Sequence, residues 1–365
     1  MAGSSFGTIF TITTWGESHG PALGVVVDGC PAGLPLSAED IQPYLDRRRP
    51  GQSAFTTQRN EADAVRILSG IYEGVTTGAP ISMMIENTDQ HSSDYGELAY
   101  TYRPGHADYT FDQKFGVRDP RGGGRSSGRE TVGRVAAGAI AAKLLSTMGI
   151  TVSAYTASIG QVSVDPARFD LEEARKNPHY MPDALAAKKA DMILEKARTE
   201  LNSVGSSVGC IVTGLPAGIG NPVFDKLDAK LAQALMSIGA VKAVEVGDGI
   251  AVSSSSGSLN NDPFRLENGE IKKIANHAGG TLGGISDGSD LILHAYFKPT
   301  PSIAQPQNTV TKDGKEVSLS IKGRHDPVIG PRAVVVVEAM TAITILDLMM
   351  TGASAKLSNL QKIYS

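Results

Sequence analysis

The sequence is poor in cysteine. Only Cys30 and Cys210 occur among its 365 residues, and two isolated thiols in so long a chain indicate a reducing compartment rather than a disulfide framework. We expect both side chains to be buried as small apolar groups. Because no CxxC or HExxH pattern occurs either, the sequence predicts no zinc site. These absences favour a cytoplasmic protein without a bound metal.

An excess of positive charge is also lacking. The chain has 34 Lys and Arg against 38 Asp and Glu, for a net charge of -4, so any site for an anion must be built locally. The first ten residues lack the charged and apolar regions of a signal peptide. The most apolar late stretch, 333–350, contains Glu338 and Asp347, which predicts a buried strand or helix rather than a membrane span. We therefore expect neither a membrane nor a nucleic acid as a partner.

Local patterns in the first third of the chain predict strands and one helix. β-branched residues indicate a strand that ends at Gly16, and residues 22–33 form a second strand that ends in glycine and proline. Ser37 is a helix cap, and that helix closes before Pro50. The stretches 63–74 and 79–87 are typical of a strand pair.

The clearest helix lies over residues 127–149. Its apolar residues recur at helical spacing, Ser127 and Glu130 match a capping box, and Gly149 is a candidate for the C-terminal cap. Further helices are predicted at 182–202 and 224–239. The chain is thus a mixed α/β (α+β) protein, built as a single domain over 1–365 or as two similar halves that meet near residue 150.

Residues 118–131, RDPRGGGRSSGRET, combine four arginines with three consecutive glycines just before that helix. A helix N-terminus carries unpaired N–H groups and partial positive charge, and glycines allow a close approach of the backbone. We therefore interpret the stretch as an anion site, with a solvated structural turn as the alternative. It is not a Walker A loop, because no Lys-Ser/Thr follows the glycines. Residues 89–127 show little periodicity, which is typical of a functional loop.

Three of the seven histidines lie in turns rich in Gly, Pro, Arg or Asp: His19 in GESHG, His106 in RPGHADYT and His325 in KGRHDP. Such histidines can exchange protons near neutral pH, although a structural hydrogen bond is the simpler interpretation of each one alone. With the arginines of DRRRPG and the hydroxyls of FKPTPS, they favour an enzyme for a polyanionic substrate. Two alternatives remain at this point: a phosphotransferase that uses Asp108, Asp112 and Asp119, and an anion- or RNA-binding module.

Taken together and in order, the motifs resemble chorismate synthase. They are GESHG, DRRRPGQS, TTQR, RPGHADYT, RGGGRSSGRET, GGISDG, KPTPS and GRHDP, and they cover the chain from residue 6 to about 348. The resemblance implies a layered β-α-β sandwich that assembles as a homotetramer. It implies the conversion of 5-enolpyruvylshikimate-3-phosphate to chorismate by anti-1,4-elimination of phosphate, the last step of the shikimate pathway. Reduced FMN is required but not consumed, and NADPH acts only indirectly as its reductant.

The resemblance also implies roles for individual residues. His19 would protonate or steady the leaving phosphate, His106 would govern the protonation of the flavin, and Asp326 would help to remove a proton from it. Flavin contacts are implied for Arg125, Ser126, Ser127, Gly239, Ala240, Gly283, Lys298, Pro299, Thr300, Pro301, Ser302 and Arg324. Substrate contacts are implied for Ser18, His19, Arg48, Arg49 and Arg129. The family often has Arg where Ala54 stands here, which weakens a direct role for NADPH.

Overall fold

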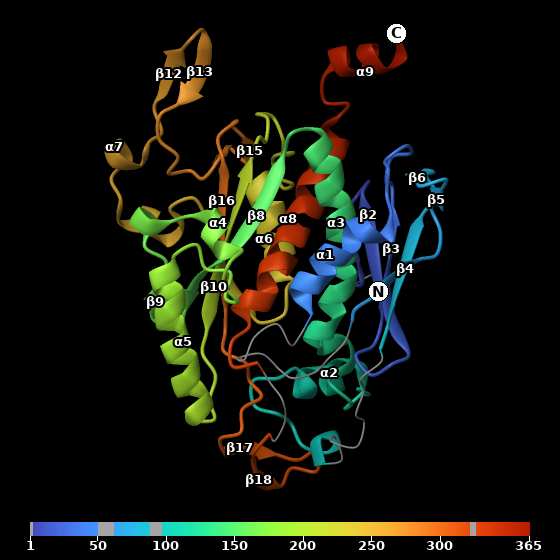
Figure 1. The fold of residues 1–365 in the computed structure, drawn as a ribbon, viewed down its shortest axis with the longest axis vertical. Coiled ribbons are helices and arrows are strands. Elements are labelled where there is room, and N and C mark those ends of the chain that lie inside the picture. Colours follow the sequence, from blue (N-terminus) through green and yellow to red (C-terminus); the bar gives the residue numbers. More distant parts are fainter. Residues whose placement is uncertain (1–2, 50–61, 88–96, 322–325) are drawn as a thin grey trace.

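Two five-stranded antiparallel sheets enclose a layer of helices (Figure 1). The computed structural model describes residues 3–49, 62–87, 97–321 and 326–365. The first sheet has the order β1-β2-β3-β7-β4 and comes from the N-terminal part of the chain. Its strands are β1 (Ser5–Phe6), β2 (Thr11–Gly16), β3 (Ala22–Asp28), β7 (Ile81–Glu86) and β4 (Val65–Ile67). The strands predicted here are confirmed, including the end of β2 at Gly16 and the pairing of β4 with β7.

The second sheet has the order β11-β16-β10-β8-β9. Its strands are β11 (Val241–Val246), β16 (Leu291–Phe297), β10 (Ser206–Thr213), β8 (Thr151–Ile159) and β9 (Val162–Ser163). Short hairpins extend the loops: β5 (Ile71–Tyr72) with β6 (Val75–Thr76), β12 (Phe264–Glu267) with β13 (Glu270–Lys273), β14 (Thr281–Leu282) with β15 (Ile285–Ser286), and β17 (Gln307–Val310) with β18 (Glu316–Leu319).

The central layer consists of α1 (Ala38–Arg48), α3 (Thr131–Thr147) and α8 (Gly330–Gly352), with α6 (Leu227–Met236) against α8 and β11. One apolar core joins these helices to the inner faces of both sheets. Outside the second sheet, α5 (Ala184–Thr199) covers β9 and builds a smaller core of its own. The resulting architecture is the layered β-α-β sandwich.

Helix α8 is the apolar stretch predicted as a buried strand or helix. It is long and apolar enough to span a membrane, but 89% of its most apolar segment is buried inside the protein. Its two acidic residues find partners within the core. Glu338 accepts hydrogen bonds from both terminal nitrogens of Arg47, at 2.9 and 2.8 Å, and Asp347 accepts three backbone N–H groups from Thr8 to Phe10. Buried carboxylates are tolerated because they are paired in this way.

Helices α3 and α8 cross at a glycine. A Cβ atom at Gly138 would lie 2.2 Å from Cβ of Ala339, a distance at which two carbon atoms cannot coexist. The close crossing therefore depends on the absence of a side chain at Gly138. The N-termini of both helices point to the same end of the molecule (Figure 1).

The start of α3 differs in part from the prediction. Ser127 does cap the segment, since its Oγ accepts the N–H of Arg129 at 3.2 Å. The capping box is wrong in its second half, because the Glu130 carboxylate turns to Nε of Arg134 at 2.8 Å, a charged partner one turn further on. A short 3-10 turn, Gly128–Glu130, precedes α3. The predicted end is confirmed, since Gly149 has φ +76°.

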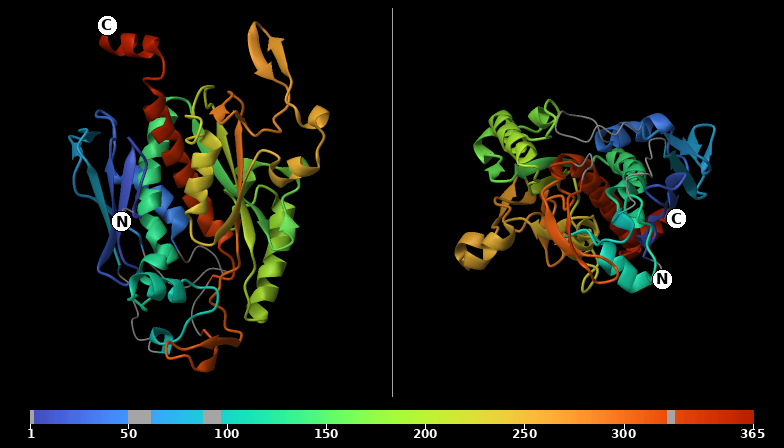
Figure 2. Two further views of the ribbon diagram at one scale, coloured as in Figure 1. Left: turned by 180° about the vertical axis from the view of Figure 1, so that it is seen from behind. Right: turned by 90° about the horizontal axis from the view of Figure 1, so that it is seen from below.

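The segment 97–127 contains a helix that the periodicity did not predict, α2 (Asp108–Phe115). The minor helices are α4 (Leu171–Ala174), α7 (Gly257–Asn260) and α9 (Leu357–Tyr364). Helix α2 and hairpin β17–β18 lie at the end of the molecule where α3 and α8 begin, whereas α9 and hairpin β12–β13 project from the opposite end (Figure 2). Both cysteines are buried and free, as expected, and burial raises the pKa of Cys30 to about 11 and that of Cys210 to about 12.

Candidate active site

A cavity of about 1850 Å³ opens at the end of the sandwich where α3 and α8 begin. Its walls come from the turn after β2, the segment 98–131, residues 237–242, the chain after β16, and the first turns of α8. The described residues that line it include eleven Lys or Arg and four Asp or Glu. A cavity this cationic, in a chain of net charge -4, is suited to a ligand that carries several negative charges. The positive ends of two helix dipoles add to the same field.

The three consecutive glycines form a turn that lies against the rings of both predicted histidines. Gly122, Gly123 and Gly124 have φ of +61°, +84° and +53°, a conformation that L side chains rarely adopt. A Cβ at Gly122 would lie 2.3 Å from Cε1 and Nδ1 of His19, and one at Gly123 would lie 2.9 Å from Cε1 of His106. The glycines therefore allow the backbone to pack on both imidazole rings. The sequence predicted that these glycines allow the backbone to approach an anion closely. It did not predict their contact with the two imidazole rings.

The turn that carries His19 is closed by Asn87. The Gly20 N–H donates to the Glu17 carbonyl at 3.0 Å, and Nδ2 of Asn87 donates to the carbonyls of Glu17 and Gly20 at 3.1 and 2.8 Å. The Oδ1 of the same amide accepts Nε of Arg129 at 3.0 Å. Asn87 therefore ties the His19 turn to an arginine at the start of α3.

Asp63 joins two of the predicted substrate arginines. Its Oδ2 accepts Nη2 of Arg48 at 2.7 Å, its Oδ1 accepts Nη1 of Arg129, and all three side chains are buried. Burial raises the pKa of Asp63, but the two guanidinium groups outweigh it and hold that pKa below its usual value. Burial, with Arg332 and Arg129 nearby, lowers the pKa of Arg48 to about 10 despite Asp63, so Arg48 is charged at neutral pH.

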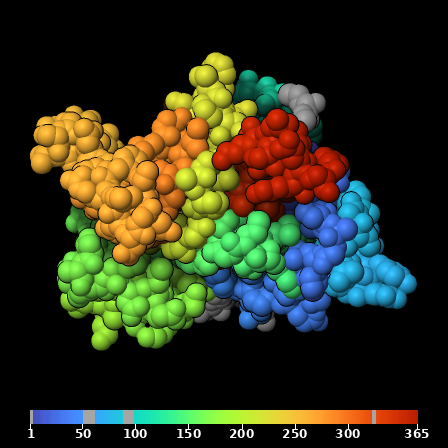
Figure 3. Space-filling view, turned by 90° about the horizontal axis from the view of Figure 1, so that it is seen from above, coloured from blue at the N-terminus to red at the C-terminus, as the bar shows by residue number. Residues whose placement is uncertain are grey.

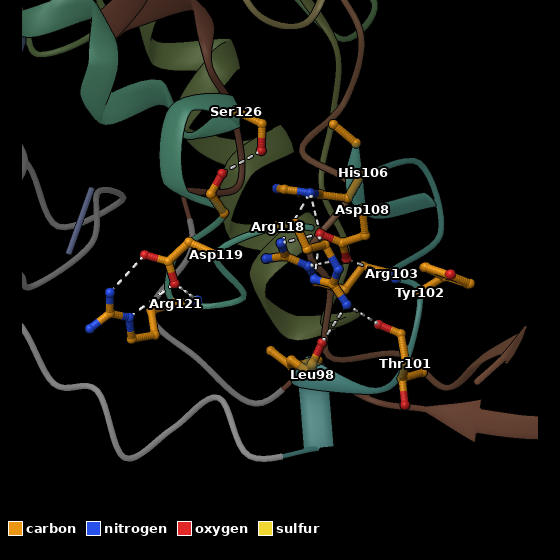
Figure 4. A network of polar contacts seen from close by, with 12 residues as sticks. Leu98, Thr101, Tyr102, Arg103, His106, Asp108, Arg118, Asp119, Arg121 and Ser126 are labelled. Atoms are coloured by element: carbon orange, nitrogen blue, oxygen red, sulfur yellow. Dashed lines mark hydrogen bonds and ion pairs between the residues drawn. The ribbon is translucent and has the colours of Figure 1, made fainter. Parts of the chain in front are cut away.

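His106 lies in a second buried network (Figure 4). Its Nδ1 is 3.1 Å from Oδ1 of Asp108 and 3.0 Å from Nη2 of Arg103. Arg118 adds an ion pair to the same Asp108 oxygen at 3.1 Å. Burial raises the pKa of Asp108, yet the hydrogen bonds from its partners hold it well below its usual value. Asp108 is therefore a fixed anion behind the imidazole.

Asp326 lines the cavity a few residues before α8 begins. Its Oδ2 accepts Nη1 of Arg332, and its backbone carbonyl accepts Oγ1 of Thr300 at 2.8 Å. Arg332 also donates Nε to the carbonyl of Arg48 at 3.1 Å. These bonds link the KPTPS segment, α8 and the end of α1, so they set the position of the Asp326 carboxylate.

Two lysines meet on the same wall. Burial, together with the charge of Lys242, lowers the pKa of Lys298, and neither lysine has an ion pair with a described carboxylate. The backbone N–H of Lys298 donates to the backbone carbonyl of Ala240 at 3.0 Å. Ala240 itself has φ +74°, and such strain in a non-glycine residue often marks a functional position.

The arginines of the glycine-rich stretch differ in what they contact. Arg118, Arg121 and Arg129 form ion pairs with Asp108, Asp119 and Asp63 respectively. Arg125 instead donates to the Gly16 carbonyl at 3.1 Å and to Oγ1 of Thr14 at 2.7 Å. Among the residues that the structure describes, it is the one arginine of the four without an ion pair to a carboxylate. Arg125 therefore keeps its charge available to a ligand.

The family model for chorismate synthase matches residues 10–350. The chain belongs to the chorismate synthase family. The chorismate synthase of Agathobacter rectalis is 58% identical over 364 residues, which cover 100% of this chain and 99% of that protein. The chorismate synthase of Lachnoclostridium phytofermentans is 59% identical over 365 residues, with 100% of both covered. A crystal structure of chorismate synthase superposes with a TM-score of 0.77 at 29% identity and covers 98% of this chain and 97% of its own.

Most of the residues that the family resemblance implied line the one cavity. They are Ser18, His19, Arg48, His106, Arg125, Ser126, Ser127, Arg129, Gly239, Ala240, Lys298, Thr300, Pro301, Ser302 and Asp326. Three described residues of the predicted set, Arg49, Pro299 and Gly283, do not line it. Nη1 of Arg49 lies 3.8 Å from Oδ1 of Asp46 at the end of α1. Pro299 packs near Gly205, and Gly283 lies in the turn between β14 and β15. Arg324, His325 and Ala54 lie outside the described residues.

Several residues of the site were missed. Asp63, Asn87 and Arg332 contribute through contacts between distant parts of the chain, and no local pattern marks them. Asp108, which was named only for the phosphotransferase alternative, and Arg103 had a signal, because they flank His106 within RPGHAD at a spacing that a short turn can close. A search for a charged partner within a few residues of each candidate histidine finds both.

Proposed function

We propose that this protein catalyses the conversion of 5-enolpyruvylshikimate-3-phosphate to chorismate. The observation that carries the proposal is the cationic cavity whose glycine turn packs against both His19 and His106, in a chain of the chorismate synthase family. The substrate has a phosphate and two carboxylates, which fits the excess of arginine and lysine. The reaction removes a proton from C6 and breaks the bond between C3 and the phosphate oxygen, so it requires both proton transfer and support for a leaving dianion.

The cavity fits a second, larger anion as well. Lys298 and Lys242 line the cavity close enough to repel each other, and Arg125, Thr300 and Ser302 line it as well. Two cations that repel each other favour a bound phosphate, and a volume of about 1850 Å³ leaves room for two ligands. We assign these residues to reduced FMN. When bound, the reduced flavin would supply the electron-rich group that assists loss of phosphate from an allylic carbon, without being consumed.

The residues of the chain have separate tasks in this scheme. His19, held by the Asn87 turn, donates a proton or hydrogen bond to the leaving phosphate. Arg48 and Arg129 orient the anionic groups of the substrate, and Asp63 keeps their guanidinium groups in place. His106 governs the protonation of the flavin, and Asp326 helps to remove a proton from it. General acid and base groups of this kind each contribute about 10²–10⁴-fold in rate.

The assembly proposed is a homotetramer in the cytoplasm. Its support comes from hairpin β12–β13, which stands clear of the body (Figure 3). The strand register puts Phe264, Leu266 and Ile271 on one face, with 50, 73 and 76% of each residue exposed. An isolated two-stranded hairpin is marginal in water, so we expect another copy of the chain to cover this face. Sedimentation velocity at micromolar concentration would give a tetramer, and a stable monomer would contradict the assembly.

The test of function is an anaerobic assay of purified protein with 5-enolpyruvylshikimate-3-phosphate and chemically reduced FMN. Chorismate absorbance and phosphate release should appear together, and His19→Ala should lower turnover by about 10²–10⁴-fold with an unchanged circular dichroism spectrum. With oxidised FMN and NADPH, no product is expected unless a separate reductase is added. Failure of the folded, flavin-loaded protein to form chorismate would overturn the proposal.

A further inference from the structure

The Nδ1 atom of His106 has two neighbours that make opposite demands. Nη2 of Arg103 lies 3.0 Å away, and Oδ1 of Asp108 lies 3.1 Å away. A guanidinium group can only donate, and an ionised carboxylate can only accept. A ring nitrogen either carries a proton or offers a lone pair, so Nδ1 can satisfy one of these partners at a time. In the neutral imidazole, the two contacts therefore require different tautomers.

Neither neighbour can change to resolve this conflict. Asp108 is 2% exposed and Arg103 is 6% exposed. Asp108 accepts the Arg103 backbone N–H at 3.1 Å, Nε at 2.7 Å and Nη2 at 2.7 Å, with Arg118 beside it. The carboxylate stays ionised, because these donors hold its pKa well below the usual value. Of the three described side chains His106, Arg103 and Asp108, which lie together in Figure 4, the imidazole is the one that can change its tautomer.

The opposite edge of the ring faces the cavity. His106 lines its wall, and a Cβ at Gly123 would be 3.4 Å from Nε2, so the glycine turn keeps that edge in place. When Nδ1 accepts from Arg103, the proton of the neutral ring is on Nε2, and the cavity receives a hydrogen-bond donor. When Nδ1–H donates to Asp108, Nε2 carries a lone pair, and the cavity receives a base.

We propose that Arg103 and Asp108 are positioning residues that keep both neutral tautomers of His106 available, so that the charge of the bound ligand selects whether Nε2 donates or accepts. An anionic ligand atom selects the tautomer with the proton on Nε2, hydrogen-bonded through Nδ1 to Arg103. A ligand atom that must lose a proton selects the Nδ1–H tautomer, and its proton then moves to Nε2 to give a cation paired with Asp108. That the ligand is reduced flavin rests on the proposed function, whereas the balance of tautomers does not.

The test is ¹⁵N NMR of protein labelled at its histidine rings, with His106→Gln used to assign the signals. In the ligand-free protein, the shifts of both His106 ring nitrogens should lie between those of the pure tautomers. Asp108→Asn replaces the anionic acceptor with a neutral amide, which accepts more weakly, and should move the balance to the Nε2–H form. Arg103→Lys replaces the guanidinium with an ammonium on a shorter side chain, which weakens donation to Nδ1, and should move the tautomer balance to the Nδ1–H form. The inference predicts that the two variants shift the tautomer balance of His106 in opposite directions, because a general loss of structure cannot produce that result.

Asp112→Asn is the matched control. Asp112 lies on the same helix as Asp108 and accepts Nε of Arg118 at 3.1 Å, but its carboxylate does not contact the His106 ring. It should leave the His106 shifts unchanged, and Asp108→Asn should lower kcat at least about 10²-fold by trapping one tautomer. A single tautomer in the wild type that does not respond to reduced FMN would overturn the inference, even if the Arg103→Lys variant did not fold. Tautomer shifts as expected without chorismate formation would refute the proposed function instead.

Discussion

Substitution of Gly122 by alanine isolates the contact between the glycine turn and His19. The residue has φ +61°, and an alanine in the left-handed region costs about 1–2 kcal/mol. Its Cβ would lie 2.3 Å from Cε1 and Nδ1 of His19, whereas carbon atoms in contact are about 3.5–4.0 Å apart. The imidazole or the turn must therefore move by more than about 1 Å. A misplacement of that size can cost about 10²-fold in rate.

The expected result for Gly122→Ala is a kcat lower by about 10²-fold and a free energy of unfolding lower by about 1–2 kcal/mol. Steady-state anaerobic kinetics and urea unfolding measure the two quantities. Gly149→Ala is the matched control, because Gly149 has φ +76° with no atom within 4 Å of a Cβ. It should lose similar stability and keep its rate. Gly123→Ala, with a milder approach to His106 of 2.9 Å, should fall between them. If Gly122→Ala kept kcat within about twofold of the wild type, the role assigned to this contact would be wrong.

The other predictions concern one residue each. Arg125→Ala should weaken FMN binding, measured by fluorescence titration, more than it lowers kcat at saturating FMN; unchanged affinity would remove it from the flavin site. Asp326→Asn should bind FMN normally and lose rate, whereas loss of binding would make Asp326 structural. Because the pKa of Asp63 is lowered in the folded state, its contribution to stability is full above its unfolded pKa of about 3.9 and is lost as the pH falls through the folded value. Asp63→Asn should cost about 3–5 kcal/mol at pH 7 and flatten the acid limb of the unfolding profile; an unchanged limb would contradict the pairing. Gly138→Leu should cost about 1–3 kcal/mol in urea unfolding, since the α3–α8 crossing leaves no room, and a neutral result would contradict that packing.

Local patterns were sufficient for much of the secondary structure. The helix α3, the strands β2 and β3 and the buried stretch that became α8 all follow from periodicity and from turn residues, because those features act over a few residues. Helix α2 was missed because it has only eight residues, so that Phe111 and Phe115 are too few to reveal a helical period, and because it lies among Gly, Asp and Arg. Glu130 was misassigned because an ion pair with Arg134 replaced the capping bond. Which of two possible partners a carboxylate binds depends on the side chains that the fold brings close to it.

The candidate site divides in the same way. His19 and His106 could be found from their turns and from the family resemblance. The reason for the three glycines could not, because it depends on two rings brought from residues more than fifteen positions away. Asp63 lies fifteen residues beyond Arg48 and sixty-six before Arg129, and only the packing of α1 against α3 brings the two arginines to one carboxylate. Long-range charge pairing of this kind leaves no trace in a single sequence.

The most direct measurement of the central claim is the ratio of phosphate released to flavin oxidised. Purified protein would be mixed anaerobically with a small, known amount of reduced FMN and an excess of 5-enolpyruvylshikimate-3-phosphate, and chorismate, phosphate and flavin would be quantified together. The account predicts chorismate and phosphate in equal amounts, far in excess of the flavin, with the flavin still reduced at the end. Phosphate release without flavin, or one flavin oxidised for each phosphate released, would contradict it.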